Sequence, residues 1–206
     1  MASLSEHLTN PYHAFVILVG SAFAAAILWP ESAPAALGPL MRGPFLPHAV
    51  AFLIGFLALE IGEAERGYGA YRPPRRAARL GGLVGFGLVL VLPFLLVHRV
   101  EAGLPWPQFA AILGFLYAYG LAWALVGYGA AAVVHWEGLR FVLEYGGLLA
   151  VIVLPAGAGL PISPIPTIGG LWAGTGDGWW GLALYAAFDA GALGAWLWTN
   201  GRSSGA

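Results

Sequence analysis

Six long apolar stretches divide this chain of 206 residues, and they constrain its fold more than any other feature. Hydrophobic residues make up 59% of the chain and charged residues 9%, against about 25% charged residues in a soluble globular domain. A hydrocarbon core of about 30 Å is crossed by roughly 20 helical residues, and each stretch is near that length. The sequence therefore predicts an all-α, polytopic integral membrane protein.

The apolar stretches are expected to be helices, because lipid cannot satisfy an open backbone and the period-2 alternation of barrel strands is missing. No other segment is long enough to bury its own core, so residues 1–206 are expected to form a single transmembrane domain. Segment 157–177 is too apolar for a soluble loop but rich in Pro and Gly, and short helical or re-entrant pieces are expected there. The expected spans are about 12–30, 45–63, 81–98, 109–134, 141–160 and 178–199.

The arginines predict the orientation of the spans. They supply every fixed positive charge on a side chain, because the chain has no lysine. If the segment between the second and third spans faces the cytoplasm, seven arginines lie inside and only Arg42 and Arg99 lie outside. This positive-inside distribution places both the N- and C-termini in the cytoplasm. The expected location is the inner cell membrane, which the chain crosses several times.

Composition and motifs argue against several functions. A net charge of -1 provides no concentrated basic surface for nucleic acid. Because the chain has no cysteine, it cannot supply thiolate nucleophiles or thiolate metal ligands. It also lacks the phosphate-binding loop motif, whose lysine it could not provide. We expect no catalytic activity on this chain, and no resident cofactor or metal is expected on this interpretation.

The segment Glu63–Arg79, between the second and third spans, holds five of the nine arginines. Gly67 and Gly69 allow a turn, and Pro73-Pro74 forces another. One interpretation is an anchor that contacts anionic lipid of the bilayer. The other is a docking element for a cytoplasmic partner, in which rim charges set register and association rate. The residues expected to make that contact are Glu63, Glu65, Arg66, Arg72, Arg75 and Arg76.

Along its whole length this topology resembles the permease subunits of type-2 ABC exporters. Six spans, inner termini, a charged inner loop and a broken segment before the last span carry the resemblance. The family's degenerate loop motif is matched by Glu65, Gly67, Pro73 and Arg75. The chain departs from the family in lacking a basic amphipathic N-terminal helix and in residues 68–71, where a Thr-Leu-rich run is usual. The resemblance implies an oligomeric permease that moves an amphiphilic substrate and docks a separate ATPase subunit on the charged loop.

Two carboxylates fall inside the expected spans. Glu144 lies about one turn into the fifth span, and Asp189 lies in the middle of the sixth. Ionised carboxylates are costly in a bilayer and commonly mark a partner or a watery cavity. Glu144 could instead pair with Arg140, four residues earlier on the same helix. Asp189 could instead be a protonated group bonded to a neighbouring helix, and the small residues around it favour close helix packing.

Four histidines support a second functional hypothesis. His13 and His135 are expected near the inner face, and His48 and His98 near the outer face. Two such pairs could ligate haem b, because neutral imidazole binds haem iron. All four also lie at span ends, where a solvated histidine is ordinary. The alternative function is a structural or haem-bearing subunit of a larger redox complex in the membrane.

Overall fold

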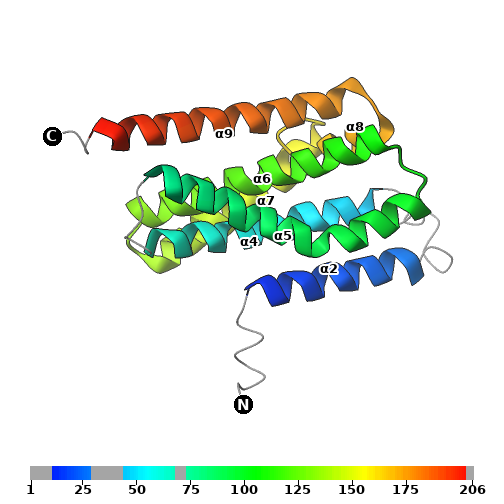
Figure 1. Ribbon diagram of the computed structural model, residues 1–206, viewed down its shortest axis with the longest axis horizontal. Coiled ribbons are helices and arrows are strands. Elements are labelled where there is room, and N and C mark those ends of the chain that lie inside the picture. The colour runs from blue at the N-terminus through cyan, green and yellow to red at the C-terminus, as the bar shows by residue number, and fades with distance from the viewer. Residues whose placement is uncertain (1–10, 29–43, 68–72, 203–206) are drawn as a thin grey trace, which may run out of the picture.

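A computed structural model describes residues 11–28, 44–67 and 73–202 of the chain (Figure 1). These described residues are mostly helical and contain no strand. A short helix, α8, lies between the last two of the six long helices. The helices are α2 (Pro11–Leu28), α4 (Phe45–Gly67), α5 (Pro73–Glu101), α6 (Trp106–Val133), α7 (Glu137–Gly157), α8 (Pro164–Ala173) and α9 (Gly176–Arg202).

The long helices run roughly along one common axis of the molecule (Figure 1). The most extensive helix–helix contact is between α4 and α6, and α6 also packs against α5, α7, α8 and α9. Within the described ranges α2 packs against α4 and α5 but against none of the other helices. A continuous apolar core joins these elements, and α6 is buried around most of its circumference.

Glycines bring the backbones of α4 and α6 into direct contact, as small residues do between membrane helices. A methyl group at Gly62 on α4 would overlap the carbonyl oxygen of Ala124 on α6. A methyl group at Gly127 on α6 would lie 2.6 Å from the carbonyl oxygen of Leu59 on α4. Both approaches are closer than ordinary van der Waals contact, so a larger residue at either position would push the helices apart.

The apolar character of the helices agrees with the predicted class of protein. Five helices, α2, α4, α5, α6 and α7, are long and apolar enough to cross a membrane, as a multi-pass membrane protein requires. The sixth long helix, α9, has 27 residues but is not among these five, and Asp189 lies in its middle. The short helix α8 confirms that segment 157–177 contains a helical piece.

The charged segment Glu63–Arg79 differs from its prediction. A loop was expected between spans ending at about residue 63 and beginning at about residue 81. Instead, α4 continues to Gly67 and α5 begins at Pro73, so most of the segment belongs to these two long helices rather than to a loop with a separate short helix. Proline suits the first turn of a helix, where its missing N–H is not needed. With 29 residues, α5 is about 43 Å long and exceeds a hydrocarbon core of about 30 Å.

Candidate functional site

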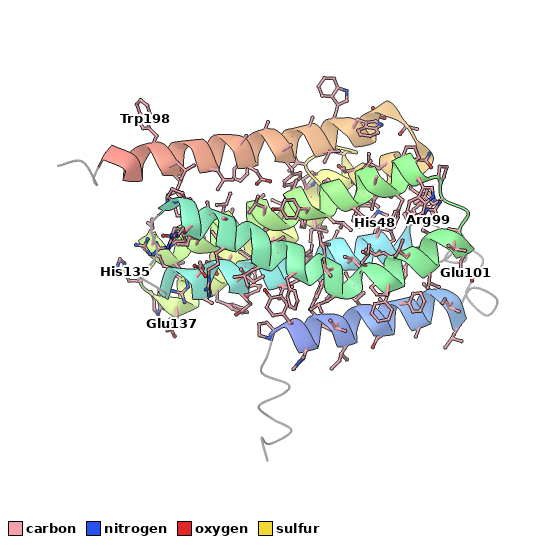
Figure 2. All side chains as sticks on the ribbon, in the orientation of Figure 1. His48, Arg99, Glu101, His135, Glu137 and Trp198 are labelled. Carbon is pink, nitrogen blue, oxygen red and sulfur yellow. The ribbon has the colours of Figure 1, made fainter. Side chains whose placement is uncertain are left out.

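Charged side chains gather at one end of the bundle, where α4 and α6 end and α5 and α7 begin (left in Figure 1). This end is called the Arg-rich end below. Figure 2 shows His135 and Glu137 there, and Arg99 and Glu101 at the opposite end. The arginines of the Arg-rich end whose side chains are described are Arg66, Arg75, Arg76, Arg79 and Arg140.

Two ion pairs connect α4 to its neighbours at the Arg-rich end. Arg79 Nε on α5 donates to Glu65 Oε2 on α4 at 2.7 Å, and the Glu65 side chain is only 1% exposed. Arg140 Nε on α7 donates to Glu63 Oε1 on α4 at 2.8 Å, and both side chains are partly exposed. A buried carboxylate left without a cation would be strongly destabilising, so Glu65 depends on Arg79. Through Glu63 and Glu65, α4 is therefore tied to both α5 and α7.

Tyr128 on α6 binds two further arginines. Its hydroxyl accepts hydrogen bonds from Arg66 Nη1 at 3.2 Å and from Arg76 Nη1 at 2.6 Å. The two guanidinium carbons lie 5.3 and 5.6 Å from the ring centroid, within the cation–π range of about 6 Å. The same ring packs against Trp196 of α9, with centroids 5.3 Å apart. Side chains of α4, α5, α6 and α9 thus meet at one phenol ring.

The six residues predicted to dock a partner divide into two groups. The two acids, Arg66 and Arg76 are held by the contacts within the chain described above. Arg75 is exposed, and Arg72 lies outside the described residues. Sequence reasoning missed Tyr128. Its position near the end of a span is the only clue in the sequence, and aromatic residues are common there because they form an interfacial belt.

An apolar groove of about 950 Å³ lies between α2 and α7, with α4 as its floor. Because α2 and α7 do not pack against each other in the described ranges, the groove stays open along one side. Aromatic and aliphatic side chains line it, among them Phe15, Phe56 and Leu149. Toward the Arg-rich end the lining includes Glu60 and Tyr145. The groove therefore combines an apolar trough with a carboxylate at one end.

Three carboxylates lie near one another at this end of the groove. The Tyr145 hydroxyl donates to Glu60 Oε1. Glu144 is 1% exposed, and its carboxyl group lies within hydrogen-bonding reach of Glu63. The charged groups that face it are Glu60, Glu63 and Arg140. The alternative in which Glu144 pairs with Arg140 is not what the structure shows, because the Arg140 guanidinium binds Glu63 on α4.

Asp189 is buried in the middle of α9. Its side chain is 6% exposed, and its Oδ1 atom has no hydrogen-bond partner in the part of the chain that the structure describes. One turn earlier, the Tyr185 hydroxyl donates to the carbonyl oxygen of Ile162 at 2.7 Å. The Tyr185 ring also packs edge-on against Tyr119 of α6, with centroids 5.2 Å apart. These contacts hold the face of α9 that carries Asp189 against the bundle.

The histidines proposed as haem ligands occupy separate environments. His48 Nε2 lies 2.9 Å from the carbonyl oxygen of Ile165. His98 is buried beside a cavity of only about 10 Å³, which cannot hold a porphyrin. His13 on α2 and His135 after α6 are exposed, and α2 packs against neither α6 nor α7. The described residues also contain no group of three His, Cys, Asp or Glu side chains suited to a metal ion. The haem hypothesis gains no support from this geometry.

Comparison with known proteins supplies no family for this chain. No protein-family model matches it, and neither the curated proteins nor the solved structures include a significant match. Function must therefore be inferred from the groove and the Arg-rich end.

Proposed function

We propose that this chain is the permease subunit of an ABC-type exporter for amphiphilic molecules, driven by a separate cytoplasmic ATPase subunit. The groove between α2, α4 and α7 carries this proposal. An apolar trough of about 950 Å³ that is open along one side suits a lipid-like molecule entering from the bilayer. The chain has no nucleotide-binding loop motif, so the energy for transport would come from a partner.

In this proposal the Arg-rich end faces the cytoplasm. Five of the six arginines with described side chains lie there, and only Arg99 lies at the opposite end, which fits the positive-inside rule. The helix α9 then serves as a sixth span, and both termini lie inside the cell. The membrane that this arrangement fits is the inner cell membrane.

The docking surface for the ATPase is proposed to be the last turns of α4 and the first turns of α5. The length of α5 carries its first turns beyond the apolar zone, and the Arg79–Glu65 pair fixes them to α4. A fixed charged surface can receive a partner in one register, and the exposed Arg75 would attract an acidic rim. Two such permease subunits would act together, each with one ATPase subunit.

Site-specific cross-linking tests this docking surface. Because the chain has no cysteine, Arg75→Cys introduces a single reactive site. In the native host, we expect Arg75→Cys to cross-link to a nucleotide-binding subunit, and Ala173→Cys at the opposite end not to do so. Charge reversal by Arg75→Glu should reduce co-purification of that subunit, whereas Arg75→Lys should preserve it. If neither the unmodified chain nor Arg75→Cys recovers a nucleotide-binding protein, the exporter proposal is refuted.

A further inference from the structure

We infer that the groove selects cationic amphiphiles, with the alkyl chain along α4 and the positively charged head group at Glu60. This inference rests on the proposed export function and names its class of substrate. It follows from the charge at the end of the groove, from a buried carboxylate beside that end, and from the size of the trough.

The first observation is the charge of Glu60. Its side chain is exposed, and among the described residues that line the groove it is the one charged group. Neither of the two ion pairs in the described ranges includes it. The Tyr145 hydroxyl orients the Glu60 carboxylate by a hydrogen bond but brings no positive charge. A cationic head group at this position is attracted to the carboxylate, whereas an anionic one is repelled.

The second observation is the lack of positive charge behind Glu60. Glu144 is buried, and its carboxyl group lies within hydrogen-bonding reach of Glu63. It faces Glu60 and Glu63, and the one cation facing it among the described residues, Arg140, already binds Glu63. Of the three carboxyl groups, Glu60 is the one that has no described cation or neighbouring carboxyl partner. A cation bound at Glu60 would neutralise this carboxylate, which neither described ion pair includes.

The third observation is the shape of the groove. Its lining residues on α4 extend from Phe52 to Glu60, which is about 12 Å along the helix axis. A volume of about 950 Å³ lies within the range of roughly 300–1,000 Å³ that is usual for small-molecule sites. An apolar trough of this size that ends in a carboxylate fits one alkyl chain that carries a positive head group.

Binding of defined amphiphiles to the purified full-length chain tests this inference. The chain is placed in nanodiscs of zwitterionic lipid without any ATPase subunit, and saturable binding of radiolabelled dodecyltrimethylammonium is measured. We expect dodecyl sulfate to bind at least about tenfold more weakly. The variant Glu60→Gln should weaken binding of the cation about tenfold, equal to about 1.4 kcal/mol. The matched variant Glu101→Gln removes an exposed carboxylate at the opposite end and should leave binding unchanged (Figure 2).

Two neighbouring glycines of α7 provide a second matched pair. Gly146 lines the groove and Gly147 does not, and a Cβ at either position would meet no atom within 4 Å. A side chain added at either position therefore begins in open space. Gly146→Leu should fill the trough and abolish saturable binding of the cation, whereas Gly147→Leu should bind as the unmodified chain does.

Several outcomes would overturn the inference. Equal affinity for dodecyltrimethylammonium and dodecyl sulfate, or equal displacement by neutral dodecyl maltoside, would mean that the groove holds any acyl chain. Cross-linking between copies through Gly146→Cys, together with no probe binding, would place a second copy of the chain in the groove. Because no ATPase is present in this assay, failure of the cation to bind would contradict only the substrate inference. The exporter proposal is tested separately by the Arg75→Cys cross-link. Conversely, absence of the cross-link would contradict the exporter proposal but not the measured binding of the cation.

Discussion

The close approach of α4 and α6 makes a sharp prediction for Gly127→Ala. The added methyl group would lie 2.6 Å from the carbonyl oxygen and 3.1 Å from the Cα atom of Leu59. Ordinary carbon–oxygen contact begins near 3.5 Å, so the two backbones must separate locally by about 0.9 Å. Neither contact involves a flexible side chain that could move aside. The separation must therefore loosen the packing on both sides of the contact.

The expected magnitude follows from two opposing effects. Overpacking of a tight contact costs roughly 1–3 kcal/mol. Alanine has a helix propensity about 1 kcal/mol more favourable than that of glycine, which offsets part of this cost. We expect Gly127→Ala to lower the free energy of unfolding by up to about 2 kcal/mol, and by about 1–3 kcal/mol relative to an alanine in open space on the same helix. Gly129→Ala is the control on the same helix, because its added Cβ would meet no atom within 4 Å.

Unfolding by SDS in mixed micelles, followed by circular dichroism, measures this difference. Gly127→Ala should unfold at a lower SDS mole fraction than the unmodified chain, and Gly129→Ala at an equal or higher one. Gly62→Ala should destabilise as well, and the double variant with Gly127→Ala should lose less than the sum, because both changes force the same separation. Equal midpoints for Gly127→Ala and Gly129→Ala would refute the close contact as a source of stability.

Three further predictions concern topology and the buried acids. Ala78 and Ala173 are both exposed and lie at opposite ends of the bundle. A single cysteine at Ala78 should react with impermeant reagents only from the cytoplasmic side, and one at Ala173 only from the outer side. The reverse result would invert the proposed orientation. Glu65→Gln should lower the free energy of unfolding by roughly 1–3 kcal/mol, because it removes a buried ion pair. A double-mutant cycle with Arg79→Gln that shows no coupling energy would contradict the contribution of this pair. Asp189→Asn should reduce transport without reducing the amount of inserted protein if the charge or proton of Asp189 serves transport; unchanged transport would leave it a packing residue.

The positions of the long helices could be predicted from the sequence, but the ends of α4 and α5 could not. Apolar runs of about 20 residues locate the membrane-crossing part of a helix, because the bilayer sets their length. Charged residues end an apolar run, and the predicted span ends with it. The helix itself can continue beyond the apolar run into water. Hydropathy therefore assigns the segment before residue 81 to a loop, whereas the structure places Arg75, Arg76 and Arg79 on the first turns of α5. Pro73-Pro74 was the better signal, because proline favours a helix start as well as a turn.

The candidate site depends on contacts that sequence spacing does not encode. Arg140 and Glu144 have the spacing of a helical ion pair, worth only about 0.2–0.5 kcal/mol. Arg140 binds Glu63 of α4 instead, at 2.8 Å, because the packing of the bundle brings this second acid within reach. The groove could not be predicted from the sequence either. It forms because α2 and α7 both pack against α4 but not against each other. The identities of the charged residues at the Arg-rich end and of the two buried acids, Glu144 and Asp189, could be read from the sequence, but their partners could not.

The last two turns of α4 connect the proposed docking surface to the groove. Along one short stretch of this helix, Glu60 lines the groove, Glu63 binds α7, Glu65 binds α5 and Arg66 binds α6. Glycine contacts with α6 leave α4 little room to slide without disturbing its neighbours. A partner that moves the start of α5 would act on α4 through the buried Arg79–Glu65 pair. Since α4 is the floor of the groove and carries its carboxylate, such a movement would change the groove itself. We therefore expect that removing the Arg79–Glu65 pair uncouples ATP hydrolysis from transport while amphiphile binding at Glu60 persists.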